Sequence, residues 1–274
     1  NHLDITSKEI LESALNSYTG TVLYVSHDRY FINKTATRIL ELTGQTLINY
    51  IGNYDYYLEK KEELTRMGNI CIDNGVKVVV DEIHSDLILT DREFVSFATI
   101  SDKFAQNSII CTSPSKSFNV AGLLVSDIII PNDEMRAAFQ EKNAAILFMA
   151  GCIRRGSTDR SYNESEEWLE ELKEYLRGNA QFIADFIQKR MPKVKYRIPE
   201  ATYLGWLDFR AYGMTDQELW DFMCHKAKVA TDDGPKFGPN GEAGGFQRIN
   251  FSCPRAQLEE ALNRIAEALM LYKL

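Results

Sequence analysis

Lys116 is the residue that its neighbours best prepare to act as a nucleophile. It lies in the segment Ser-Pro-Ser-Lys-Ser-Phe-Asn, behind Ser113 and Ser115, directly after an apolar run at 108–112 that predicts a buried strand. A lysine held on a rigid edge can be desolvated, which favours the neutral amine that forms a Schiff base with a carbonyl. Because a lysine in a polar loop is more often simply solvated, this segment alone is a weak signal.

A second chemical group lies upstream, where a β-branched run at 76–80 ends in Asp81 and is followed by His84. Such a run is typical of a parallel strand, and the carboxyl end of a parallel strand is the usual ligand edge of an α/β sheet. An acid at that edge can keep a pyridinium nitrogen protonated. Asp81 is therefore a candidate cofactor ligand.

The elements that must position these residues form a mixed α/β pattern. Apolar runs and alternation predict strands at 21–25, 39–42, 76–80, 109–112, 123–130, 194–198, 203–209, 229–231 and 247–251. Helical spacing predicts helices at 7–15, 54–74, 133–145, 164–191, 215–226 and 254–271. Gly75 suits the position just after a helix, and residues 148–163 are expected to form an irregular loop.

Composition is that of a globular protein, with 45% hydrophobic and 26% charged residues. The formal net charge of -8 argues against a nucleic-acid partner, which needs clustered Lys and Arg. The five cysteines include no Cys-x-x-Cys pair, so we expect no metal site and a reducing compartment, the cytoplasm. No apolar stretch is long enough to cross a membrane, and no signal-peptide pattern is visible.

Three motifs in order carry a family resemblance. They are Asp-Glu-Ile-His-Ser-Asp-Leu at 81–87, Ser-Pro-Ser-Lys-Ser-Phe-Asn-Val-Ala-Gly-Leu at 113–123, and Phe-Gln-Arg-Ile-Asn-Phe at 246–251. Together they resemble pyridoxal-phosphate enzymes of the aspartate aminotransferase fold (fold type I), in the cystathionine β-lyase or cysteine C–S lyase branch. The resemblance implies part of the family's large-domain α/β sheet at 64–162 and its α+β small domain at 163–274.

The same resemblance implies roles in binding pyridoxal 5'-phosphate. Lys116 would be the catalytic residue, linked to the cofactor and later taking the substrate α-proton. Asp81 would pair with the ring nitrogen, and His84 would lie near the ring hydroxyl. Ser113, with Ser115 as a weaker candidate, would bind the phosphate.

Arg248 would bind the substrate α-carboxylate, a task suited to a planar guanidinium, although a surface ion pair is the commoner role of a lone arginine. Where many relatives carry a phosphate-binding arginine, this chain has Leu124, which fits the C–S lyase branch better than a standard transaminase. The implied reaction is α,β-elimination from cystathionine or a cysteine S-conjugate, giving a thiol, ammonia and pyruvate. The implied partners are this thioether amino acid and a second copy of the chain in a homodimer.

The first part of the chain resembles a different family. Asn-His-Leu-Asp at 1–4, Tyr-Val-Ser-His-Asp-Arg-Tyr-Phe at 24–31 and Tyr-Ile-Gly-Asn-Tyr at 50–54 are similar to the C-terminal end of an ATP-binding-cassette F-type ATPase. This resemblance covers about residues 1–63 and implies that Asp4 belongs to the D-loop and that His27 is the switch histidine. The family's phosphate-binding loop, signature sequence and catalytic Walker B carboxylate are absent here.

The two resemblances meet in a charged stretch at 58–68, so we interpret the chain as a chimera of two fragments. Because the upstream half of the lyase family is also absent, the chimera is expected to be inactive and to retain the cofactor poorly. Two alternatives stay open. The chain could be an ATPase fragment that binds ATP in a translation-associated role, or a non-catalytic fusion product.

Overall fold

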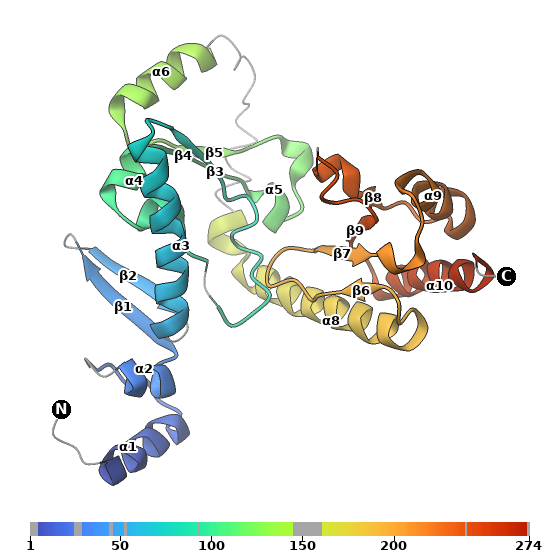
Figure 1. The fold of residues 1–274 in the computed structure, drawn as a ribbon. Coiled ribbons are helices and arrows are strands. Elements are labelled where there is room, and N and C mark those ends of the chain that lie inside the picture. Colours follow the sequence, from blue (N-terminus) through green and yellow to red (C-terminus); the bar gives the residue numbers. More distant parts are fainter. Residues whose placement is uncertain are drawn as a thin grey trace. The chain divides into compact units, whose positions relative to one another are not determined.

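A computed structural model describes residues 5–24, 29–43, 46–51, 54–92, 94–144, 161–238 and 240–272 (Figure 1). The chain divides into two compact units. The first comprises Asn1–Asp86 and Asp91–Asp159, and the second comprises Leu87–Thr90 and Arg160–Leu274. The short segment Leu87–Thr90 is hydrogen-bonded into the second unit, since the Leu89 N–H donates to the Glu200 carbonyl at 2.8 Å.

The first unit begins with two helices, a hairpin and a long helix. Their bounds are α1 Ile5–Ser17, α2 Arg29–Thr35, β1 Arg38–Thr43, β2 Thr46–Ile51 and α3 Tyr54–Asp73. Strands β1 and β2 are antiparallel. The strand predicted at 21–25 is wrong over its described part, because residues 21–24 have no strand pairing and Val22 and Leu23 are exposed. The sequence predicted the strand from its apolar run, but strand pairing requires a neighbour.

Helix α3 ends as the sequence predicts. Gly75 has a positive φ of 66°, its N–H donates to the Ile72 carbonyl, and the N–H of Val76 donates to the Cys71 carbonyl at 2.8 Å. These two bonds are those of a Schellman cap, which favours a residue without a Cβ at this position. Near the end of α3 the buried Gly68 lies against Phe104, where an added Cβ would come within 2.5 Å of the ring.

The central sheet of the first unit has the order β3-β4-β5, with bounds β3 Val78–Asp81, β4 Ser108–Thr112 and β5 Asp127–Ile129. Strands β3 and β4 are parallel, and β4 and β5 are antiparallel. The connecting helices are η1 Phe97–Thr99, α4 Asp102–Gln106, α5 Pro114–Ser117, η2 Ala121–Leu123 and α6 Asp133–Ala144. The pairing of these three strands in one sheet agrees with the part of an α/β sheet that the family resemblance implies at 64–162.

The predicted strand at 123–130 is shorter than expected. Leu124 adopts a left-handed conformation with φ 51° directly after the turn η2, so extended structure begins only at Asp127. A leucine is costly in this conformation because its Cβ approaches the following carbonyl. The sequence gives no sign of it, since Leu, Val and Ile all favour an extended run.

The second unit is a four-stranded antiparallel sheet with the order β6-β7-β9-β8 and two long helices (Figure 1). The strands are β6 Lys195–Tyr196, β7 Leu204–Asp208, β8 Asp232–Asp233 and β9 Phe246–Asn250. The long helices are α8 Glu166–Arg190 and α10 Arg255–Tyr272. Their apolar sides form one core with the inward residues Leu207 and Ile249 of the sheet.

The smaller elements of the second unit differ in part from prediction. They are η3 Arg210–Tyr212, α9 Asp216–Asp221, the π-helical turn Phe222–Ala227 and η5 Gly234–Phe237. The helix predicted at 215–226 is thus divided between α9 and a π-helical turn. The strand predicted at 229–231 lies instead at Asp232–Asp233, because pairing with β9 and not β-propensity sets its place.

Asn179 connects α8 to the segment between β9 and α10. It is fully buried, and its amide donates to the carbonyls of Phe251 at 2.8 Å and Cys253 at 3.0 Å, while its oxygen accepts from Arg255 Nε at 2.7 Å. Both amide protons and the amide oxygen of this buried side chain therefore have hydrogen-bond partners.

Residues 148–160 of the predicted irregular loop lie outside the described residues, and residues 161–163 are helical. Among the helices that the structure describes, none has both the length and the apolar character to span a bilayer.

Candidate functional site

Asp81 is the last residue of β3 and is exposed at the carboxyl end of that strand. Its Oδ1 accepts a hydrogen bond from the Ile83 N–H at 3.2 Å, which begins the turn at 83–86. Its partner on β4 is Cys111, and burial together with the negative charge of Asp81 raises the pKa of that thiol. The acid therefore lies at the sheet edge where β4 also ends.

Glu82 follows immediately but is directed into the protein. It is buried, and its Oε1 accepts hydrogen bonds from the Ser96 hydroxyl at 2.9 Å and the Phe97 N–H at 3.1 Å. Burial raises the pKa of this carboxyl, and the two hydrogen bonds oppose the shift. Of the two adjacent acids, only Asp81 is available at the edge.

Lys116 lies on α5, which follows β4 directly. Ser113 caps this helix by accepting from the Ser115 N–H at 3.1 Å, and Pro114 fills the first helical position. Lys116 is half-buried, and no hydrogen bond or ion pair of its amine is found within the described residues. Since β3 and β4 are parallel, the sheet brings Lys116 and Asp81 to the same edge.

Two residues hold this edge together that the sequence reading did not single out. The buried Ser117 hydroxyl donates to Asp86 Oδ2 at 2.6 Å. This bond joins α5, which carries Lys116, to the turn after β3, which carries His84 in a half-buried position. The sequence signal for this pair was that Asp86 lies in the motif at 81–87 and Ser117 in the motif at 113–123.

The hydroxyls of Ser113 and Ser115 lie 2.7 Å apart. They also lie 2.6 and 3.4 Å, respectively, from the carbonyl oxygen of Val125. A hydroxyl has one proton, so the carbonyl takes the proton of Ser113 in this arrangement. An anion at these hydroxyls would have to compete with Val125.

Arg248 belongs to the second unit, on β9. Its Nε and Nη2 both donate to Asp232 Oδ2, at 3.2 and 2.8 Å, and its guanidinium lies 4.4 Å from the ring centroid of Phe237. The charge of Arg248 also acts on Tyr203: burial raises the pKa of the Tyr203 phenol, and the positive charge of Arg248 opposes that shift. Arg248 thus forms an ion pair with Asp232, a partner that the sequence did not identify.

The remaining two predicted site residues, Asp4 and His27, lie outside the described residues.

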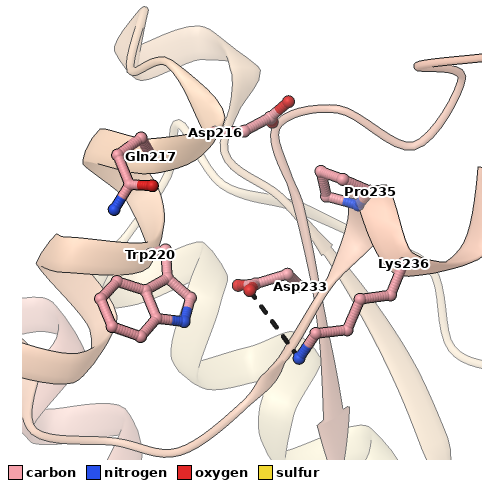
Figure 2. A pocket seen from close by; sticks show the side chains of 6 residues that line it. All are labelled: Asp216, Gln217, Trp220, Asp233, Pro235 and Lys236. Atoms are coloured by element: carbon pink, nitrogen blue, oxygen red, sulfur yellow. Dashed lines mark ion pairs between the residues drawn. The ribbon is translucent and has the colours of Figure 1, made fainter.

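A pocket of about 370 Å³ lies elsewhere in the second unit (Figure 2). Its lining residues are Asp216, Gln217 and Trp220 of α9, and Asp233, Pro235 and Lys236 of β8 and η5. Its acids already have partners: Asp216 accepts from the Gly245 N–H at 2.7 Å, and Asp233 accepts from Gln247 at 3.0 Å. None of the residues predicted from the sequence lines it.

Comparison with known proteins shows similarity over most of the chain. The model of the family "aminotransferase class I and II" matches residues 57–265. Cystathionine beta-lyase PatB of Bacillus subtilis is 42% identical over 212 residues, which make up 76% of this chain and 54% of PatB. The crystal structure of cystalysin from Treponema denticola, which contains pyridoxal 5'-phosphate, has a TM-score of 0.74 at 33% identity, covering 77% of this chain and 54% of that one.

A separate similarity is short. YdiF of Bacillus subtilis, whose name assigns ATP binding to it only provisionally, is 64% identical over 63 residues, which are 23% of this chain and 10% of YdiF. The chain therefore spans about half the length of the lyase relatives and a small part of YdiF.

Proposed function

Because the chain belongs to the class I and II aminotransferases, a family that depends on pyridoxal 5'-phosphate, we propose that its lineage is that of a C–S β-lyase. The reaction is α,β-elimination from cystathionine or a cysteine S-conjugate to a thiol, ammonia and pyruvate. The observation that carries the proposal is the half-buried Lys116, without a partner among the described residues, at the sheet edge where Asp81 also lies.

The side chains at this edge fit the cofactor chemically. Lys116 would supply the amine for its aldehyde, Asp81 the carboxylate for its ring nitrogen, and Ser113 and Ser115 the hydroxyls for its phosphate. His84, half-buried on the turn after β3, is proposed for the ring hydroxyl. The cofactor, when bound, supplies an electron sink for the carbanion formed at the substrate α-carbon.

The chain's own residues have distinct tasks. Asp81, fixed by the Ile83 N–H, would keep the ring nitrogen of the bound cofactor protonated, and Lys116 would take the α-proton of the substrate. The bond from Ser117 to Asp86 keeps α5 in place while the Lys116 side chain moves. Ser113 must turn its hydroxyl proton from the Val125 carbonyl to a phosphate oxygen, which lowers phosphate affinity.

We assign Arg248 to the α-carboxylate of the thioether amino acid, with Asp232 as its present partner. Two copies of the chain would form the family's homodimer, and the cytoplasm is the proposed compartment. The domain limits at 1–63, 64–162 and 163–274 follow the two resemblances.

We further propose that the chain is a chimera whose first 63 residues derive from an ATP-binding-cassette F-type protein, which the 64% identity to YdiF supports. ATP hydrolysis is the second candidate function, with Asp4 and His27 as its residues. Measuring ATP turnover in the chain and in His27→Ala tests it: turnover that the substitution abolishes would favour the ATPase over the lyase.

The lyase proposal is tested by cofactor labelling of the full chain. Pyridoxal 5'-phosphate is added, its adduct with lysine is trapped by borohydride, and the labelled peptide is found by mass spectrometry. We expect the label on Lys116 and its loss in Lys116→Ala. The matched control is Lys77→Ala, since Lys77 is an exposed lysine whose amine binds Asn107 at 3.0 Å. A folded chain labelled equally at both lysines, or at neither, would overturn the proposal.

A further inference from the structure

Arg248 lies in a row of three residues that crosses the second unit's sheet. In the strand register Arg248 is paired with Trp206 on β7 and with Asp232 on β8. The neighbouring residues Leu207 and Ile249 point into the core and are buried. Because side chains alternate along a strand, the row of Trp206, Arg248 and Asp232 lies on the opposite face of the sheet.

The guanidinium of Arg248 is held on one edge and over one ring. Both Nε and Nη2 donate to a single oxygen, Oδ2 of Asp232, which takes the side edge of the fork. Phe237 lies against the guanidinium at 4.4 Å, and the ring of Phe237 meets that of Trp206 edge to face at 5.4 Å. The direction of the guanidinium is therefore set by Asp232 and Phe237.

The opposite end of the guanidinium is available. Within the described residues no acceptor is found for Nη1, and the side chain of Arg248 keeps 28% of its surface exposed. The Nη1 and Nη2 groups together present two parallel N–H bonds, the geometry that receives both oxygens of a carboxylate.

We propose that Asp232 is the positioning residue of the carboxylate site: it occupies the side edge of Arg248 and directs the substrate carboxylate end-on to Nη1 and Nη2. This inference rests on the proposed function, in which Arg248 binds the α-carboxylate. The ligand class is an α-amino acid with a free carboxylate.

The arrangement has an electrostatic consequence. The negative charge of Asp232 offsets part of the charge of Arg248, and a second carboxylate on the same guanidinium is repelled by the first. Asp232 therefore fixes the direction of the Arg248 guanidinium but lowers its affinity for a substrate carboxylate. Asparagine in its place would keep an oxygen for the fork and remove the repulsion, so we expect Asp232→Asn to bind a carboxylate roughly five-fold more tightly.

The test uses the full chain without cofactor, labelled with ¹⁵N, and S-methyl-L-cysteine as the probe. The Arg248 Nε–H signal is assigned by its loss in Arg248→Lys and followed during titration. In the unliganded chain this proton should exchange slowly with water, because Asp232 accepts it, and fast in Asp232→Ala. The dissociation constant should fall roughly five-fold in Asp232→Asn.

The matched control is Asp233→Asn. Asp233 is the adjacent acid on the same strand, but its carboxylate binds Gln247 at 3.0 Å and not Arg248. The substitution makes the same change in net charge, so an unaltered dissociation constant shows that the effect of Asp232 is local. An equal gain in both variants would reduce the effect to net charge and overturn the inference.

The outcomes separate the inference from the proposed function. Binding that is unchanged in Arg248→Lys refutes the carboxylate role of Arg248, and the inference with it. Binding that is lost in Arg248→Lys but is no tighter in Asp232→Asn than in the parent chain refutes Asp232 alone. If no probe binding is detected even in Asp232→Asn, the inference also fails.

Discussion

Replacing Asn179 with alanine should destabilise the second unit by about 3 kcal/mol. The substitution leaves the buried carbonyls of Phe251 and Cys253 without a donor and removes the oxygen that accepts from Arg255 Nε. Each of these three losses costs about 1 kcal/mol. Because the side chain is fully buried, water does not replace the amide without opening the contact between α8 and α10.

Asn179→Asp gives a sharper test, because it keeps an oxygen for Arg255 while placing a second oxygen opposite two carbonyls. The new charge is buried, with one oxygen on Arg255 and the other against the two carbonyls. We expect the burial and the repulsion from the carbonyls to outweigh the attraction of Arg255, so this variant should be less stable than the alanine variant by about 1 kcal/mol. If packing alone mattered, aspartate, which has nearly the shape of asparagine, would be the milder change.

Urea unfolding followed by tryptophan fluorescence measures the effect. All three tryptophans, at 168, 206 and 220, lie in the second unit, so this signal reports on that unit. With a slope of about 2 kcal/mol per M, the midpoint should fall by about 1.5 M in Asn179→Ala. Gln181→Ala is the control, since the Gln181 amide lies on the same helix α8 but donates to Asp185 on its exposed side at 2.9 Å. An alanine variant as stable as this control, or an aspartate variant as stable as the parent, would refute the reasoning.

Three further predictions concern stability. Tyr196→Phe should leave the stability of the second unit unchanged or raise it by about 0.5–1 kcal/mol in the same urea assay. The reason is that the buried Tyr196 hydroxyl has no hydrogen-bond partner among the described residues, and burial raises the pKa of this phenol. A loss of stability above about 1 kcal/mol would show that the hydroxyl has a partner after all. Asp208→Asn should lower the stability of the second unit by about 1 kcal/mol at neutral pH. The hydrogen bonds from Arg210 hold the pKa of Asp208 below its ordinary 3.8, so the parent chain loses this stabilisation as the pH falls from about 4 through the folded pKa. The urea midpoints of the parent chain and the variant should therefore converge at low pH. Hydrogen exchange should show strong protection in the helices α8 and α10 and fast exchange before residue 52. Uniform protection with one cooperative melt would instead mean that the two fragments have fused into one integrated domain.

The sequence predicted the order of the elements better than their edges. The long helices follow from hydrophobic spacing, which acts over a few neighbouring residues. The sheet of β3, β4 and β5 is expected from the family resemblance and not from that spacing. The strand predicted at 123–130 is too long, because the surroundings of Leu124 hold that residue in a left-handed conformation. The strand predicted at 229–231 is misplaced, because pairing with β9 sets the position of β8. Both errors come from tertiary contacts overriding local preference.

The candidate site, too, could be predicted only in part from the sequence. The placement of Asp81 and Lys116 at one sheet edge could be predicted, because both follow apolar runs and parallel strands end together. The bond between Ser117 and Asp86 spans 31 residues, and that between Arg248 and Asp232 spans 16. Neither pair has a periodic signal, so only the folded chain shows them.

The contact between Gly68 and Phe104 restricts where this chain can change in length. Gly68 must face the ring, and each residue added to a helix turns all that follows by about 100°. An insertion or deletion within α3 between Gly68 and its end at Asp73 would rotate the glycine relative to the chain that follows and bring a side chain against Phe104. Residues added or removed before Gly68 do not change the direction in which Gly68 faces Phe104. We therefore expect natural variants of α3 to differ in length only on the N-terminal side of Gly68.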